Sequence, residues 1–155
     1  MRELRRDDVK AINHILRATG AFTETEVAVA LELIEIILSD PEQKDYAAYV
    51  AETDGRVSGY ILYGQVPLTE GNYEIYWIAV DPATQGQGVG RKLLRHLEEL
   101  LRAAGGRMIC LETSSQPGYA RTRLFYDKAD YVEESCIRDF YRPDDHRLTY
   151  VKRLI

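Results

Sequence analysis

Hydrophobic residues recur at spacings of three and four in three stretches of the chain, which is the pattern of amphipathic helices, and a fourth helix is expected from about Tyr119 to Lys128. The first stretch begins with Asp7 and Asp8, and acidic residues favour a helix start because they face the positive end of the helix dipole. The second begins after Thr23, where Glu26 completes the spacing of a capping box. The third follows a glycine-rich segment and ends at Gly105. The pattern therefore predicts helices over residues 7–18, 24–39, 89–104 and 119–128.

Between these helices the pattern changes to aromatic and β-branched runs, which are typical of strands. Two such runs flank the turn Thr53-Asp54-Gly55, so a hairpin is expected there. Tyr73–Val80 is the strongest strand pattern in the chain, and Asp81-Pro82 closes it. The other predicted strands cover residues 46–51, 57–63, 107–113, 147–154 and the segment from residue 131 to the turn at 143–145.

The predicted elements follow the order two helices, three strands, helix, strand, helix, two strands. A strand, a helix and a strand in succession imply a parallel pair, whereas the other strands are joined by hairpins. We therefore predict an α/β fold with a mixed sheet, not a doubly wound one. A chain of 155 residues buries about 70% of its surface on folding, which is enough for one stable core. One domain is expected over residues 1–155.

Composition narrows the class of partner. The formal charge of −5 disfavours a broad electrostatic contact with nucleic acid or with an anionic membrane. No apolar run approaches the ~20 residues that span a bilayer, and the charged N-terminus lacks the apolar stretch of a secretory signal. Cys110 and Cys136 lie in apolar runs, where a cysteine usually acts as a small buried hydrophobe. We expect a cytoplasmic protein in a reducing compartment.

The segment from Gln85 to Arg91 joins the strongest strand to the most regular helix and holds three glycines in five positions. Glycine lets a bulky group approach the backbone, and exposed amides at a helix start favour an anion such as phosphate. The alternative is a merely tight turn. A P-loop signature is absent, and a dinucleotide fingerprint fails because Arg91 or Leu93 stands where its third glycine belongs. Glu112, at the end of the next strand, keeps a nucleotide-binding interpretation open.

Two motifs resemble those of the GNAT acyltransferase superfamily. The first is Gln-x-x-Gly-x-Gly, which begins at Gln85, follows a strand ending in Val80-Asp81-Pro82 and precedes an amphipathic helix. The second is the run from Leu124 to Tyr131, which is similar to the family's Phe/Leu-Tyr-x-Lys-x-Gly-Phe/Tyr segment. Both occur in the family's order, and the element order matches over about the whole chain.

The resemblance implies a mostly antiparallel sheet with helices on both faces and a splayed parallel strand pair at the cofactor site. It implies that acetyl-CoA is the co-substrate, with its pantetheine arm paired like an extra strand to the backbone. It also places the Ile78 N–H near the thioester carbonyl as an oxyanion donor. The residues implied to bind the cofactor are Ile78, Ala79, Val80, Gln85, Gly86, Gln87, Gly88, Val89, Gly90 and Arg91.

Tyr126 corresponds to the family's tyrosine that protonates the departing thiolate, and its alternative role is that of an ordinary core aromatic. Glu74 corresponds to the glutamate that deprotonates the attacking amine in some members; its alternative is an exposed acid at a strand end. Glu112 on the next strand is a reserve base. Two positions depart from the pattern: Tyr119 replaces an asparagine, and Asp130 replaces a glycine but tolerates a left-handed cap.

These features predict an N-acetyltransferase that moves an acetyl group from acetyl-CoA to a primary amine by direct attack in a ternary complex. The acceptor is a small molecule or a peptide, and the alternative is a non-catalytic acyl-CoA or nucleotide binding module. No metal is expected, because the histidines are scattered and His96 should face solvent. Arg123 and Asp127 are expected to pair on their helix. Homodimerisation through a sheet edge is an open expectation.

Overall fold

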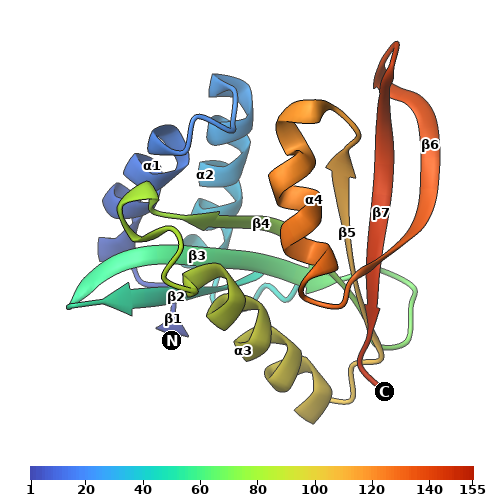
Figure 1. Cartoon of the computed structure of the whole chain (residues 1–155). Coiled ribbons are helices and arrows are strands. Elements are labelled where there is room, and N and C mark those ends of the chain that lie inside the picture. The colour runs from blue at the N-terminus through green and yellow to red at the C-terminus, as the bar shows by residue number, and fades with distance from the viewer. The chain divides into compact units, whose positions relative to one another are not determined.

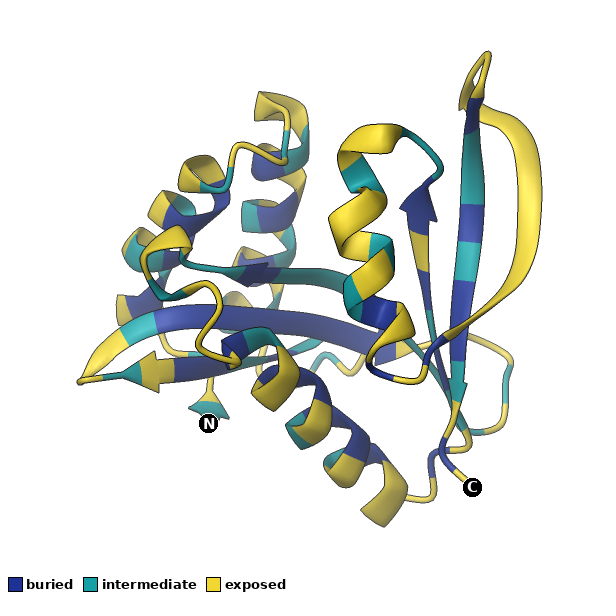
Figure 2. Cartoon of the chain, in the orientation of Figure 1, coloured by how far each residue is buried: buried dark blue, intermediate teal, exposed yellow.

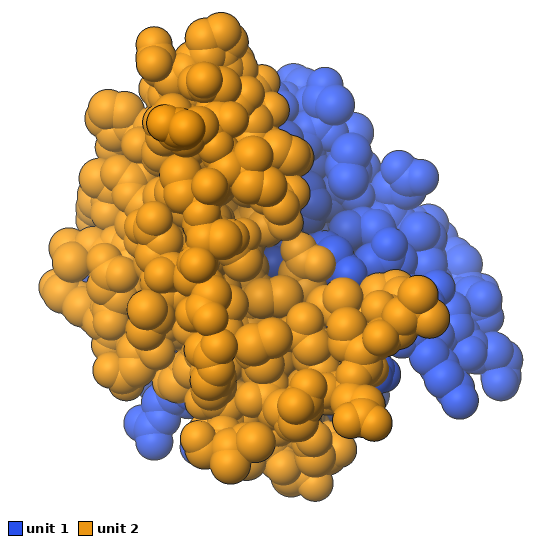
Figure 3. Space-filling view, turned by 90° about the vertical axis from the view of Figure 1, so that its right-hand side faces the viewer, with its two compact units in different colours: residues 1–65, 75–99 blue, residues 66–74, 100–155 orange.

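The computed structural model describes residues 1–155, and its strands form a seven-stranded sheet in the order β1-β2-β3-β4-β5-β7-β6 (Figure 1). The sheet is mostly antiparallel, and β4 with β5 is its one parallel pair. The predicted mixed α/β class is confirmed. The chain folds as two compact units, which are coloured separately in Figure 3. Unit 1 comprises residues 1–65 and 75–99, and unit 2 comprises residues 66–74 and 100–155.

Unit 1 begins with a two-residue strand and a helical pair. The capping box predicted at Thr23 and Glu26 is present, because each side chain bonds the other residue's backbone amide. One apolar face of each helix packs on the β2–β3 hairpin, in a core that includes Ile12, Ile34 and Tyr60. The elements are β1 (Arg2–Glu3), η1 (Arg6–Asp8), α1 (Val9–Ala18), α2 (Glu24–Ser39), β2 (Ala47–Thr53) and β3 (Arg56–Gln65).

The opposite face of the same hairpin carries α3 (Val89–Ala103), whose residues up to Glu99 belong to unit 1. Gly59 on β3 lies under the first turns of α3, because a Cβ there would come within 3.2 Å of Val89 and Leu93. Helices therefore cover both faces of the β2–β3 hairpin. In chain order, β3 is followed by β4 (Asn72–Val80), which continues into the short helix η2 (Pro82–Thr84) and then into α3. The Asp81 carboxylate caps η2 by accepting a hydrogen bond from the Ala83 N–H at 3.0 Å.

Unit 2 contains three strands and one helix besides the first residues of β4. Antiparallel ladders join β5 to β7 and β7 to β6. The helix α4 packs its Tyr126 ring against Tyr150 of β7 and against Tyr131, with ring centroids 6.2 and 5.6 Å apart. The elements are β5 (Met108–Ser114), η3 (Pro117–Tyr119), α4 (Ala120–Asp127), β6 (Val132–Arg142) and β7 (Asp145–Arg153).

The edge strand β6 differs from expectation. All of its residues are exposed (Figure 2), so Cys136 is an exposed thiol and not the buried hydrophobe predicted, while Cys110 is half-buried. The ladder with β7 is interrupted twice, between Glu133 and Ser135 and again between Ile137 and Arg142. Such bulges hinder the pairing of an edge with another strand. No helix is long and apolar enough to cross a membrane.

Candidate active site

The glycine-rich loop lies in unit 1 between η2 and α3. Gly86 and Gly88 have φ of +81° and +78°, a conformation that side chains rarely adopt, and no atom lies within 4 Å of the place of a Cβ. The first intrahelical bond joins Lys92 N–H to the Gly88 carbonyl at 3.0 Å. The amides of residues 89 and 90 therefore have no acceptor inside the helix. Open space beside these amides and the positive helix end suits a phosphate group.

The β4 strand supplies the second part of the predicted cofactor site. In the parallel pairing with β5, residues 72–74 match residues 108–110, and the register ends there. Ile78, Ala79 and Val80 therefore lie in the part of β4 that β5 does not pair. A chain of amides such as pantetheine could use the backbone groups on that side. Ile78 and Val80 are half-buried, whereas the Ala79 side chain is buried.

Tyr126 is almost fully buried in unit 2, with 4% of its surface exposed. Its ring lies 5.2 Å from Phe125 and belongs to the cluster with Tyr131 and Tyr150. Burial raises the pKa of the Tyr126 phenol well above its ordinary value, since the charged phenolate would lose its hydration. The hydroxyl is therefore protonated near neutral pH and can act only as a neutral donor or acceptor.

Glu74 stands at the end of the β4–β5 register, directly beside Cys110. Paired residues point to the same sheet face, and Glu112 follows Cys110 by two positions, so all three side chains share one face. Burial raises the pKa of Glu74, and the charge of Glu112 raises it further. Burial also raises the pKa of the Cys110 thiol to about 11, so the thiol stays protonated near neutral pH. Glu74, the predicted base, and Glu112, the predicted alternative base, therefore lie on the same face of the sheet.

Arg147 lies on the same sheet face as Glu74 and Glu112, and it is not among the site residues predicted from the sequence. It begins the β7 ladder opposite Ser114, which places it diagonally from Glu112 on the same face. Its Nη1 lies 3.4 Å from Glu112 Oε1. The positive charge of Arg147 partly offsets the upward shift in the pKa of Glu74. Only the strand register reveals this neighbour, because the two residues lie far apart in the sequence.

The phenol and the carboxylates lie on opposite faces of the unit 2 sheet. Tyr126 contacts Tyr150, which pairs with Leu111 on the face covered by α4. Glu112 pairs with Thr149, so its side chain points to the other face. The Tyr126 phenol and the Glu74 and Glu112 carboxylates are therefore separated by one layer of backbone.

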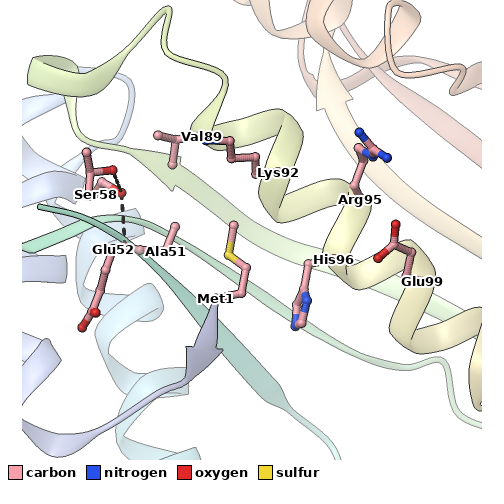
Figure 4. A pocket seen from close by; sticks show the side chains of 10 residues that line it. Met1, Ala51, Glu52, Ser58, Val89, Lys92, Arg95, His96 and Glu99 are labelled. Carbon is pink, nitrogen blue, oxygen red and sulfur yellow. Dashed lines mark hydrogen bonds between the residues drawn. The ribbon is translucent and has the colours of Figure 1, made fainter. Parts of the chain in front are cut away.

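Unit 1 contains two hollows near α3. The first, about 440 Å³, is lined by Lys92, Arg95 and His96 among others, and Val89 is the one predicted site residue in it (Figure 4). The second, about 480 Å³, lies beside η2 and includes Gln87.

The expectation that His96 faces solvent is wrong. Its ring packs against Tyr49 at 4.6 Å, and its Nε2 is buried without a partner. Helical spacing places His96 on the same face of α3 as Val89 and Leu93, and this face packs on the sheet. His96 therefore points toward β2.

Two further expectations concern α4. Asp130 adopts φ of +64°, and Tyr131 N–H bonds the Tyr126 carbonyl at 3.0 Å, so the left-handed cap forms without glycine. Arg123 does not pair with Asp127 as expected. Its Nη1 instead donates to the backbone carbonyls of Ser114 and Gln116 at 2.8 and 2.9 Å, which ties α4 to the end of β5.

The mixed sheet, with a glycine loop leading from its parallel strand into a helix, is an acyltransferase fold. A family model described as the Acetyltransferase (GNAT) family matches residues 10–131, and the chain belongs to this family. A solved GNAT-family protein from Desulfovibrio desulfuricans is 36% identical, with a TM-score of 0.93 over 99% of this chain and 98% of that one.

Two other proteins extend this comparison. S-(2-succino)cysteine N-acetyltransferase of Bacillus subtilis is 33% identical over 100 residues, which span 62% of this chain and 61% of the relative. This chain thus spans about three fifths of that relative's length. An aminoglycoside 6′-N-acetyltransferase solved with coenzyme A shares the fold, with a TM-score of 0.76 at 19% identity over 99% of this chain and 96% of that one.

Proposed function

We propose that the chain is an N-acetyltransferase that transfers the acetyl group of acetyl-CoA to a primary amine by direct attack in a ternary complex. The observation that carries this proposal is the placement of Tyr126 and Glu74 on opposite faces of the unit 2 sheet. In a direct transfer the amine loses a proton on one side of the thioester while the thiolate gains one on the other. The acid and the base therefore have to stand apart, as these residues do.

The glycine loop supports the choice of acetyl-CoA. The positive φ angles of Gly86 and Gly88 and the free space beside them leave room for a pyrophosphate against the backbone amides from Gln85 to Arg91. The unpaired part of β4 fits the pantetheine arm at Ile78, Ala79 and Val80. The solved relative with coenzyme A has the same fold, which is consistent with this assignment.

Each residue then has one task. Glu74 takes a proton from the acceptor ammonium, and its raised pKa makes it a stronger base than an ordinary glutamate. The amine nitrogen forms its bond to the thioester carbon while the Ile78 N–H stabilises the carbonyl oxygen, and the carbon–sulfur bond breaks. Tyr126 gives its hydroxyl proton to the departing sulfur, the acylated nitrogen releases its second proton to solvent, and solvent restores the proton of Tyr126. Glu112 acts through its charge on Glu74 and is the reserve base.

We further propose that both units serve one transferase domain, because the likeness to the Desulfovibrio protein extends over 99% of the chain. The acceptor is the amine of a small molecule or a peptide. The named Bacillus relative acts on an amino acid derivative, which supports an amine acceptor of this kind.

Replacing Tyr126 with Phe tests the catalytic assignment. We expect kcat to fall on the order of 10²- to 10⁴-fold, because the sulfur would leave without a proton donor. Affinity for acetyl-CoA, measured by calorimetry, should stay within about twofold of wild type. Tyr150→Phe is the matched control, since it removes a hydroxyl from the same aromatic cluster and should retain full turnover. Unchanged turnover in Tyr126→Phe would remove the general acid from the mechanism, and acetyl-CoA binding without any turnover in wild type would favour a binding module.

A further inference from the structure

Arg147 has more hydrogen-bonding capacity than the protein uses. A guanidinium carries five N–H donors, and the one charged partner of Arg147 is Glu112, at 3.4 Å. Its Nε is buried and has no acceptor. The side chain is 25% exposed, so solvent and small molecules can reach part of the group. The buried Nε is out of reach of a ligand, but the exposed part of the guanidinium can donate to an oxygen acceptor from outside the chain.

The guanidinium also lies over an aromatic ring. Its central carbon lies 4.4 Å above the Phe140 ring, which in turn contacts Tyr141 at right angles with centroids 5.1 Å apart. Phe140 and Tyr141 are about half exposed and lie on the outer strand β6. Stacking of this kind orients an arginine and leaves its edge available for hydrogen bonds. Arg147 thus contacts Phe140 of β6 and Glu112 of β5 at the same time.

The same face therefore offers two kinds of contact next to each other. Glu74 and Glu112 attract an ammonium group, whereas Arg147 attracts a carbonyl or carboxylate oxygen. In an α-amino acid or a peptide N-terminus these two groups are attached to one carbon. A simple alkylamine or a polyamine has the ammonium but no such oxygen, and would leave the guanidinium donors unsatisfied.

We propose that Arg147 recognises the oxygen of the carbonyl group adjacent to the acceptor amine, so that the preferred acceptor carries an α-amino-acyl group. This inference rests on the proposed N-acetyltransferase function and specifies its substrate class. Arg147 determines specificity and does not exchange a proton. The free amino acid and the peptide N-terminus share the recognised chemistry, and the experiment below separates them.

The test compares acceptors that differ only in the group beside the amine. Alaninamide resembles a peptide N-terminus, alanine offers a carboxylate, and isopropylamine has a methyl group in place of either. Thiol release from acetyl-CoA gives kcat/KM for each acceptor with wild type and with Arg147→Gln. The ratio of alaninamide or alanine to isopropylamine should fall by about tenfold to a hundredfold in the variant, as expected for the loss of a charged donor. The amines differ in their own pKa, but this difference is the same for both proteins.

The matched control is Arg153→Gln, which removes another arginine from β7 whose partner is Glu134 on the exposed strand β6. It should leave the ratio unchanged. In Arg147→Gln, a larger loss of kcat/KM for alanine than for alaninamide would identify a free amino acid as the acceptor. A larger loss for alaninamide would identify a peptide N-terminus. If Arg147→Gln lowers kcat/KM equally for all three acceptors, or for none of them, the recognition role is wrong. A purely structural or electrostatic role would change kcat/KM by the same factor for every amine.

A binding measurement separates this proposal from the proposed function. Alaninamide and isopropylamine are titrated into wild type and into Arg147→Gln by calorimetry in the presence of coenzyme A. Preferential binding of alaninamide that is lost in the variant supports recognition by Arg147 even if the protein transfers no acetyl group. Equal binding of the two compounds to wild type overturns the inference even if transfer is observed.

Discussion

Glu74 is the residue at which neighbouring charges have the clearest consequence. Burial and the charge of Glu112 both raise its pKa, and Arg147 lowers it. Because Glu74 must be deprotonated to accept a proton, the acetylation rate should rise as pH increases through its pKa. The position of this acidic limb is therefore set first by the burial of Glu74 and then by its two charged neighbours.

Glu112→Gln should move the acidic limb of the kcat profile to lower pH. The substitution removes the like charge that raises the pKa of Glu74, while Arg147 continues to lower it. The profile is measured with one acceptor at saturating acetyl-CoA. Glu134→Gln is the control, because it makes the same change of charge on the exposed strand β6. Glu134 pairs with Arg153. A limb that moves to higher pH, or that disappears in Glu112→Gln, would make Glu112 the base instead of Glu74.

Sequence reasoning at this scale succeeded where the chemistry is local. Asp130 was expected to cap α4 in the left-handed region, and it does so through bonds within six residues. His96, Cys136 and Arg123 were misjudged because their surroundings come from other elements. Arg147 was missed for the same reason, since its nearness to Glu112 depends on the β5–β7 register.

Among the elements, the glycine loop and the start of α3 connect the fold to the proposed cofactor. Gly86 and Gly88 both have positive φ angles. A Cβ at either position would contact no atom of the protein, so close packing does not explain why these positions are glycines. This distinguishes them from Gly59, where a Cβ would come within 2.8 Å of the Ala79 carbonyl. Gly59 is needed for close packing of the strands, whereas the loop glycines leave open space at a helix start.

Gly88→Asp should weaken acetyl-CoA binding by more than about tenfold, because a carboxylate at the helix start repels the pyrophosphate. Gly20→Asp is a matched control: Gly20 also has a positive φ, +65°, and open space around it, and it lies in the loop between α1 and α2. Both substitutions impose a similar backbone strain, about 1 kcal/mol, so thermal unfolding should be affected alike. Calorimetry that finds equal acetyl-CoA affinity in the two variants would contradict the phosphate assignment.

The elements themselves were largely predictable because their signals are local. The capping box at Thr23, the turn at Asp54-Gly55 and the apolar periodicity of α3 each confirm a predicted boundary to within a few residues. The strand β1 was not predicted, since two residues carry no periodicity. It is held by pairing with β2 and by Arg2, which binds Asp8 at 2.7 Å and Glu52 at 2.7 Å.

For the whole molecule, the predicted parts of the reaction come from both units. The glycine loop and the unpaired residues of β4 belong to unit 1, whereas Glu74, Glu112, Tyr126 and Arg147 belong to unit 2. Residues of both units were predicted from the sequence, except Arg147, whose place beside Glu112 depends on the β5–β7 register. Acceptor preference could not be predicted from the sequence, since it depends on side chains from strands far apart along the chain.

The most direct test of the account is a pair of calorimetric titrations of the purified protein, one with acetyl-CoA and one with NADH. Both ligands carry a pyrophosphate, but only acetyl-CoA has a pantetheine arm for the unpaired part of β4. We expect acetyl-CoA to bind with a dissociation constant near the micromolar range and NADH not to bind. Absence of acetyl-CoA binding, or equal binding of both ligands, would contradict the assignment of the glycine loop and β4 to an acyl-CoA site.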